Sequence, residues 1–236
     1  MSAVNTTKWI SVGLLGLVLY GALTFWTALD PQPDPNTEYE AWAHYVSTGY
    51  YVLKHLFGSI LGMVFALFGT FALGAYLARS RAGRLGLTAM VITVVGYALF
   101  LTIGGVSAFA SPGEGQAYVA GDYEFAQIAA SGFAVTAQTF TLLLSSVLVL
   151  VGNVLLGVAI WRSGTLPRWA GALWAAGAVL MLLLGQLIAI FLTGSTPVTV
   201  LVGAVLLVIS GGWMAWSVLR NPSAGAVGVQ AHPRVQ

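Results

Sequence analysis

The sequence predicts an all-α polytopic membrane protein with six transmembrane helices. Composition is the first observation: 58% of the 236 residues are hydrophobic and only 7% are charged, whereas a soluble domain has roughly 25% charged residues. The second is that the few charges separate long uncharged stretches. Because a charge at the centre of a bilayer costs roughly 2.5 kcal/mol or more, each such stretch marks a candidate span.

The first three uncharged stretches each suit one crossing, which takes about 20 residues. They contain 21 residues between Lys8 and Asp30, 24 between Lys54 and Arg79, and 29 between Arg84 and Glu114. We therefore expect one helix from each stretch.

The fourth stretch is longer, with 37 residues between Glu124 and Arg162. It fits one long helix with an interfacial start at 125–131 and a break at Gly132. One further helix is therefore expected here.

The fifth stretch has 51 residues between Arg168 and Arg220, too many for one crossing. The sequence Thr-Gly-Ser-Thr-Pro at 193–197 predicts a turn between two helices. Residues 1–220 are thus expected to form one six-helix bundle, and the polar segment 221–236 a disordered cytoplasmic tail.

The charges sort by side of the membrane in this six-span arrangement. One side carries Lys8, Arg79, Arg81, Arg84, Arg162, Arg168, Arg220 and Arg234, and the other carries Asp30, Asp34, Glu38, Glu40, Glu114, Asp122 and Glu124. By the positive-inside rule, both termini are cytoplasmic. Lys54, at the top of the second span, is the basic residue on the outer side.

The chain contains an internal similarity. Glu38-Tyr39-Glu40 recurs as Asp122-Tyr123-Glu124, and Leu73-Gly74 before Arg79-Ser80 recurs as Leu156-Gly157 before Arg162-Ser163. We interpret these matches as two parallel out-in-out hairpin repeats, about 37–110 and about 121–195, flanked by the first and last helices. The alternative is chance similarity between apolar helices.

A polar stripe is predicted at the outer end of the second span. If one helix runs inward from Thr37, with Thr37 and Glu40 as a capping box, then Glu40, His44, Tyr51 and His55 share one face. His44 and His55 are candidate metal ligands, but about 16 Å of helix would separate them, so one chain could not bind a single ion with both. Haem or metal binding would therefore use His55 with a ligand from elsewhere.

Polar residues near the outer ends of several spans predict a recess open to the outside. Gln138 aligns with His55 in the repeat, and Gln186 lies near the outer part of the fifth span. Amide and hydroxyl groups in a bilayer need partners, so they should face the bundle interior. The candidate ligand-binding set is Tyr51, His55, Gln138 and Gln186, and the alternative is that these groups bond only to one another.

Four outer acids, Glu38, Glu40, Asp122 and Glu124, are candidates for a mouth that attracts cations. Residues two apart on a helix point about 200° away from each other, so only one acid per repeat could face a shared site. The plainer interpretation is that acids suit the first turn of a helix.

The segments Arg162–Gly171 (RSGTLPRWAG) and Arg81–Gly86 (RAGRLG) resemble inner-loop segments of small multi-pass membrane proteins of actinobacterial type. The resemblance covers roughly residues 55 to 192, and that group has no assigned activity. It implies a bacterial plasma-membrane location and no particular chemistry.

The sequence narrows the possible functions. It has no cysteine and no GxSxG, HExxH, Walker A or GxGxxG motif, and its few basic residues argue against nucleic-acid binding. We expect a non-enzymatic integral membrane protein, either an accessory subunit or a small-ligand binder with an outward-facing recess. The alternatives are a small cation or proton transporter or channel, and a haem- or metal-binding redox protein using His55. Expected partners are the lipid bilayer and a second copy or a larger membrane complex.

Overall fold

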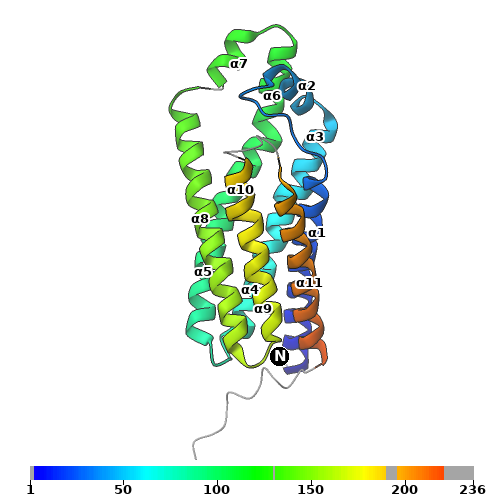
Figure 1. Cartoon of the computed structure of the whole chain (residues 1–236), viewed down its shortest axis with the longest axis vertical. Helices are drawn as coiled ribbons and strands as arrows, with labels where there is room; N and C mark the ends of the chain where they lie inside the picture. The colour runs from blue at the N-terminus through cyan, green and yellow to red at the C-terminus, as the bar shows by residue number, and fades with distance from the viewer. Residues whose placement is uncertain (1–2, 130, 190–195, 221–236) are drawn as a thin grey trace, which may run out of the picture.

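The computed structural model describes residues 3–129, 131–189 and 196–220, whose regular secondary structure is entirely helical. Long helices run side by side along the long axis, and short helices form a cap at one end (Figure 1). The elements are α1 (Ala3–Ala28), α2 (Tyr39–Val46), α3 (Gly49–Lys54), the π-helical segment η1 (His55–Leu61), α4 (Gly62–Leu77), α5 (Gly83–Gly105), the π-helical η2 (Val106–Ala110), α6 (Ser111–Val119), α7 (Tyr123–Ala129), α8 (Gly132–Ser163), α9 (Arg168–Ala178), the π-helical η3 (Val179–Leu184), α10 (Gly185–Ile188) and α11 (Val198–Arg220).

The predicted six spans are confirmed. Within the described residues, six helices are long and apolar enough to cross a membrane, namely Lys8–Ala28, Gly49–Leu77, Gly83–Val119, Gly132–Ser163, Arg168–Ile188 and Val198–Arg220. The third does not end at Glu114 but continues to Val119. At 1.5 Å per residue its 37 residues exceed the roughly 30 Å of a hydrocarbon core, so its outer end extends beyond the bilayer into the cap.

The spans form a closed ring in chain order. Span one, α1, packs on α4, α4 on α5, α5 on α8, α8 on α9, α9 on α11, and α11 returns to α1. The first and last spans are therefore neighbours, as Figure 1 also shows for α1 and α11.

Glycines let neighbouring spans approach closely at two crossings. A Cβ on Gly157 of α8 would lie 2.6 Å from the Gly171 carbonyl oxygen of α9, and one on Gly203 of α11 would lie 2.7 Å from the Gly177 carbonyl oxygen. Small residues at such crossings allow the backbone contact that drives helix association in lipid. These contacts fix the fifth span between its two neighbours.

The predicted break at Gly132 is confirmed. Gly132 has a φ of +87°, which favours glycine, and it separates the short α7 from α8. Of the turn predicted between the last two spans, Thr196 and Pro197 are non-helical, and residues 193–195 lie outside the described part of the chain. The predicted tail, 221–236, also lies outside it.

The predicted continuous helix from Thr37 to His55 is wrong. The helix α2 begins at Tyr39, and its N-cap Glu38 makes no side-chain capping bond, so the capping box is absent. After Val46 the chain turns, and Thr48, in an extended conformation, accepts a hydrogen bond from the Tyr51 amide at 3.2 Å and starts α3. The break removes the helical register on which the predicted polar stripe depended.

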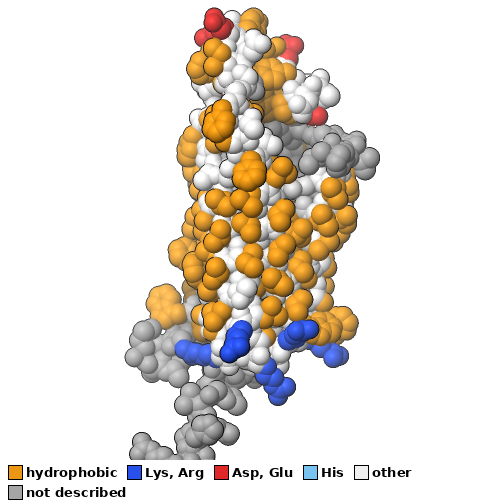
Figure 2. All heavy atoms as spheres, turned by 90° about the vertical axis from the view of Figure 1, so that its left-hand side faces the viewer, with side chains coloured by type: hydrophobic (Ala, Val, Ile, Leu, Met, Phe, Trp, Pro, Cys, Tyr) orange, Lys and Arg blue, Asp and Glu red, His pale blue; other side chains and the backbone are white. Residues whose placement is uncertain are grey.

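Charge separates along the bundle. Figure 2 shows Lys and Arg side chains at one end, Asp and Glu at the cap end, and a hydrophobic band between them. This distribution is typical of a bundle that spans a bilayer. We refer to these as the basic end and the acidic end.

Candidate functional site

Three adjoining cavities lie in the half of the bundle nearer the acidic end. The inner chamber has a volume of about 240 Å³, and two outer chambers have volumes of about 300 and 340 Å³. Thr24, Thr27 and Ser59 line both the inner chamber and the first outer one, while Met181 and Gln186 line both the inner chamber and the second. We call these three adjoining chambers together the outer recess.

The inner chamber is largely apolar with a few polar groups. Its walls come from five of the six spans and include Tyr20, Met63, Phe100, Val149 and Leu182. Ser59 lies on η1, where the i+5 bonding pattern interrupts the regular α-helix, and π-helical segments are frequent at functional sites. The chamber therefore combines an apolar wall with a small number of hydrogen-bonding positions, as ligand sites usually do.

Gln186 supplies one of these positions. Its side-chain amide nitrogen donates a hydrogen bond to the Ser146 hydroxyl at 2.8 Å, which joins α10 to α8. The Gln186 carbonyl oxygen and the Ser59 hydroxyl have no partner in the described part of the chain. Both groups are thus available to a ligand in the inner chamber.

A buried polar network lies below the inner chamber. The Asn153 side-chain amide donates to the Val149 carbonyl at 2.7 Å and to the Tyr97 hydroxyl at 3.4 Å, and its oxygen accepts from the Trp174 indole N–H at 3.0 Å. Asn153 is 2% exposed and Trp174 is fully buried. The network joins α5, α8 and α9, and Tyr97 forms part of the chamber wall.

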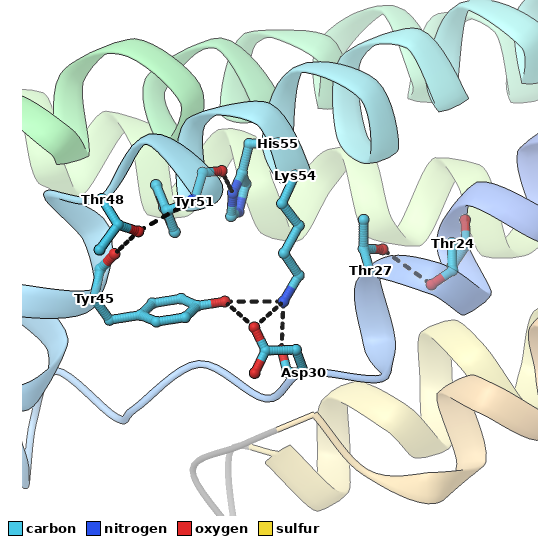
Figure 3. A network of polar contacts seen from close by, with 8 residues as sticks. All are labelled: Thr24, Thr27, Asp30, Tyr45, Thr48, Tyr51, Lys54 and His55. Atoms are coloured by element: carbon cyan, nitrogen blue, oxygen red, sulfur yellow. Dashed lines mark hydrogen bonds and ion pairs between the residues drawn. The ribbon is translucent and has the colours of Figure 1, made fainter.

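Lys54 is held at the rim of the first outer chamber (Figure 3). Its ammonium group donates to the Tyr45 hydroxyl at 2.9 Å and to the Asp30 carbonyl, and it lies 3.4 Å from the Asp30 carboxylate. Tyr45 in turn donates to that carboxylate at 2.9 Å. Lysine has three donors, so its hydrogen-bonding capacity is used within the protein.

Tyr45 lies in α2, outside the spans, and its contact with the Asp30 carboxylate affects the ionisation of its hydroxyl group. Burial, followed by the hydrogen bond to the Asp30 carboxylate, raises the pKa of Tyr45 above its ordinary value of 10.0. The phenol therefore remains a donor at neutral pH.

His55 and Tyr51 are adjacent but differ in their access to the recess. The Tyr51 ring is 2% exposed and lies 4.0 Å from the His55 ring, centroid to centroid. His55 lines the first outer chamber, and its Nδ1 lies 3.0 Å from the Tyr51 carbonyl oxygen. Its Nε2 is therefore the ring nitrogen left for a ligand, and the Tyr51 ring packs against the imidazole from one turn nearer the acidic end.

Gln138 lies apart from the other three predicted recess residues. It is on α8, and none of the described chambers is lined by it. No described residue of α8 before Ser145 is buried, so the outer part of this helix stands away from the bundle. The structure thus brings His55 and Gln186 to the recess, with Tyr51 behind His55.

The four predicted mouth acids, Glu38, Glu40, Asp122 and Glu124, are all exposed and line none of the described chambers. A different acid is engaged in the cap: Glu114 accepts a hydrogen bond from the Tyr39 hydroxyl at 2.7 Å. Burial and this carboxylate raise the pKa of Tyr39.

The predicted metal ligands do not come together. His44 lies on α2 and is exposed, while His55 lies about two helical turns beyond the α2–α3 break, at the start of η1. In residues 3–129, 131–189 and 196–220, no three His, Cys, Asp or Glu side chains are grouped as a metal site.

Sequence reasoning missed Asp30, Tyr45 and Ser59. A lone basic residue at the outer end of a span requires an acceptor, and Asp30 directly follows the first span, so the pairing with Lys54 had a signal in the sequence. Ser59 had none, because a serine in an apolar helix usually bonds to its own backbone.

No protein-family model, curated protein or solved structure matches this chain.

Proposed function

We propose that the protein is a non-enzymatic integral membrane protein that binds a small ligand in the outer recess. The observation that supports this most strongly is the inner chamber itself, a cavity of about 240 Å³ with unpaired polar atoms on Gln186 and Ser59. Unpaired polar groups facing a cavity between spans are costly unless water or a ligand satisfies them.

The lining indicates the class of ligand. Tyr20, Met63, Phe100, Val149 and Leu182 favour an apolar body. Gln186 can accept one hydrogen bond and Ser59 can donate or accept another. We therefore propose a neutral, mainly apolar molecule with one or two hydrogen-bonding groups, entering past His55 in the first outer chamber.

Membrane orientation belongs to the same proposal. The basic end would face the cytoplasm of a bacterial plasma membrane and the recess would face outward, because basic residues are retained on the cytoplasmic side. An accessory role in a larger complex is compatible with this site, since a bound ligand could be handed to a partner subunit.

The two alternatives have weaker support. A cation or proton transporter with an acidic mouth would be expected to direct Glu38, Glu40, Asp122 or Glu124 toward the recess, and all four are exposed elsewhere. For a haem- or metal-binding redox protein, His55 would need a second ligand from another chain.

Native mass spectrometry of gently solubilised protein tests the proposal. Ser59→Phe is designed to fill the inner chamber, and Thr102→Phe is the matched control, because Thr102 is an exposed position on α5. The wild-type protein and the control are expected to retain a small-molecule mass that Ser59→Phe lacks. If all three carry the same masses, or if none carries any while remaining folded, the proposal fails.

A further inference from the structure

The basic end contains a second cavity, unrelated to the outer recess. It has a volume of about 610 Å³ and is lined by the arginines Arg81, Arg84 and Arg162, together with Ser80, Leu85 and Leu87. Arg81 reaches across to the turn that follows α8, since a Cβ on Gly164 would lie 3.9 Å from the Arg81 side chain. We call this cavity the basic hollow.

The three arginines of the hollow have no partner within the described part of the chain. None of them has a described hydrogen bond, ring contact or ion pair, and the ion pair found in that part joins Lys54 to Asp30. All seven Asp and Glu residues of the sequence lie between residues 30 and 40 or between 114 and 124, in or beside the cap helices α2, α6 and α7 (Figure 1). Three arginines that line one cavity thus lack a carboxylate to balance their charge.

Two other arginines at the same end are accounted for differently. Arg220 lies 4.4 Å from the centre of the Trp216 ring, and Arg168 lies 5.7 Å from Trp161 and 5.8 Å from Trp169. Cation–π contacts of this kind stabilise an arginine at a membrane interface. The arginines of the hollow have no such ring contact among the described residues, and they differ from Arg79 in lining a common cavity.

The positive end of the α5 helix dipole also favours an anion near Arg84. This residue lies in the first turn of α5, which has no acidic residue there and whose N-cap Ala82 offers no capping side chain. The amides of Arg84 and Leu85 find no acceptor in the described residues, whereas Gly83 and Gly86 do. A cation at the positive end of a helix is unfavourable on its own, but an anion placed there would meet both the guanidinium groups and the free amides.

The apolar residues that line the hollow indicate the chemical class of the anion. Leu87 is 42% exposed and lines the hollow one turn inside the bilayer from Arg84, and Leu85 also lines the hollow. An acyl chain can follow these leucines while a phosphate lies among the arginines, which is how basic pockets between spans hold lipid headgroups. We propose that the basic hollow binds the phosphate of an anionic phospholipid.

The test measures lipid affinity of the full chain by native mass spectrometry in a neutral detergent. Phosphatidylglycerol is titrated against phosphatidylcholine with identical acyl chains. The variant Arg81→Gln/Arg84→Gln removes two charges from the hollow, and Arg168→Gln/Arg220→Gln removes two charges from the same end but outside it. For Arg81→Gln/Arg84→Gln, the dissociation constant for phosphatidylglycerol is expected to rise about 30-fold. This estimate takes about 1 kcal/mol for each arginine near an anionic lipid. The second pair should change the dissociation constant less than about threefold.

Several outcomes would overturn the assignment. Equal losses in both pairs would mean that total charge, and not the hollow, attracts the lipid. Equal affinity of the wild type for both lipids would also contradict it. Glycerol 3-phosphate is added as a competitor: displacement of the lipid at micromolar concentration would assign the site to a soluble phosphate. If the first pair does not fold, judged by helicity, the single variants Arg162→Gln and Arg168→Gln make the same comparison.

Discussion

The ammonium group of Lys54 lies 3.4 Å from the Asp30 carboxylate, with the lysine 4% exposed and the aspartate side chain 42% exposed. This unequal burial determines what the pair contributes. Lys54 is surrounded by protein and depends on its partners, whereas Asp30 is half hydrated. The pair also joins the end of the first span to the start of the second, and through Tyr45 to the cap helix α2.

The two single substitutions should therefore differ in cost. Asp30→Ala leaves a buried ammonium with only neutral acceptors, and we expect it to lower the free energy of unfolding by about 2 kcal/mol, less than for a fully buried pair because Asp30 is partly solvated. Lys54→Met leaves a hydrated carboxylate that still accepts from Tyr45, and its cost should stay below about 1 kcal/mol. Unfolding in mixed micelles measures both, and equal costs would contradict the unequal roles.

Alkaline pH should weaken the cap through two tyrosines. The pKa values of Tyr39 and Tyr45 are raised above the ordinary 10.0, so the folded cap keeps both phenols protonated when the unfolded chain has begun to release these protons. Their contribution is fully present below pH 10.0 and is lost as the pH rises toward their folded-state pKa values. The unfolding midpoint of Tyr39→Phe/Tyr45→Phe should consequently fall less steeply above about pH 10 than that of the wild type. If the unfolding midpoints of the variant and the wild type change in parallel above about pH 10, these phenols do not contribute to the pH dependence of stability.

The number and approximate limits of the spans could be predicted from sequence because each depends on local properties. Charges mark the ends of the spans to within about two turns, although the second span includes Lys54 and the third continues past Glu114 to Val119. Gly132 breaks a helix through its own φ. The error at Thr37–His55 has a local cause as well: Ser47 and Thr48 start a new helix, and periodicity alone treats them as ordinary helix residues. The internal repeat stays a prediction.

The outer recess was harder to predict because cavities depend on packing between spans. Gln186 and His55 were correctly directed to the interior by the cost of polar groups in lipid. Gln138 has the same chemistry, yet the outer part of α8 stands away from the bundle, and no feature of its sequence indicates this. Hydrogen bonds between apolar spans, such as that from Trp174 to Asn153, could be recognised only once the packing of the spans was known.

The Asn153 network should stabilise the bundle through Trp174. Asn153→Leu removes the acceptor of a fully buried indole N–H, and we expect a loss of about 1–2 kcal/mol. Thr93→Val is the control, because the Thr93 hydroxyl bonds only to the Ala89 carbonyl of its own helix. Its cost should be below about 0.6 kcal/mol, the average for a polar contact between spans. A loss no larger in Asn153→Leu than in the control would contradict the role of the network.

Close packing of α8 on α9 gives another prediction. A Cβ on Gly157 would approach the Gly171 carbonyl oxygen to 2.6 Å and the Ala175 side chain to 2.8 Å. Gly157→Ala should thus destabilise the protein by about 1–3 kcal/mol. In Gly105→Ala the added methyl group meets no described atom within 4 Å, so a neutral or slightly stabilising effect is expected. Thermal unfolding compares the two, and a similar midpoint for both would mean that the α8–α9 crossing is loose.

If a ligand reaches the inner chamber from the acidic end, a single thiol on the chamber wall should report its presence, and the absence of cysteine from the sequence permits this measurement. Ser59→Cys places a single thiol on the chamber wall, and a small membrane-impermeant maleimide is applied from the outside before native mass spectrometry. We expect individual molecules to carry either the maleimide or the co-purifying ligand, and never both. Molecules that carry both masses, or a thiol that reacts only when the opposite side is exposed, would contradict it.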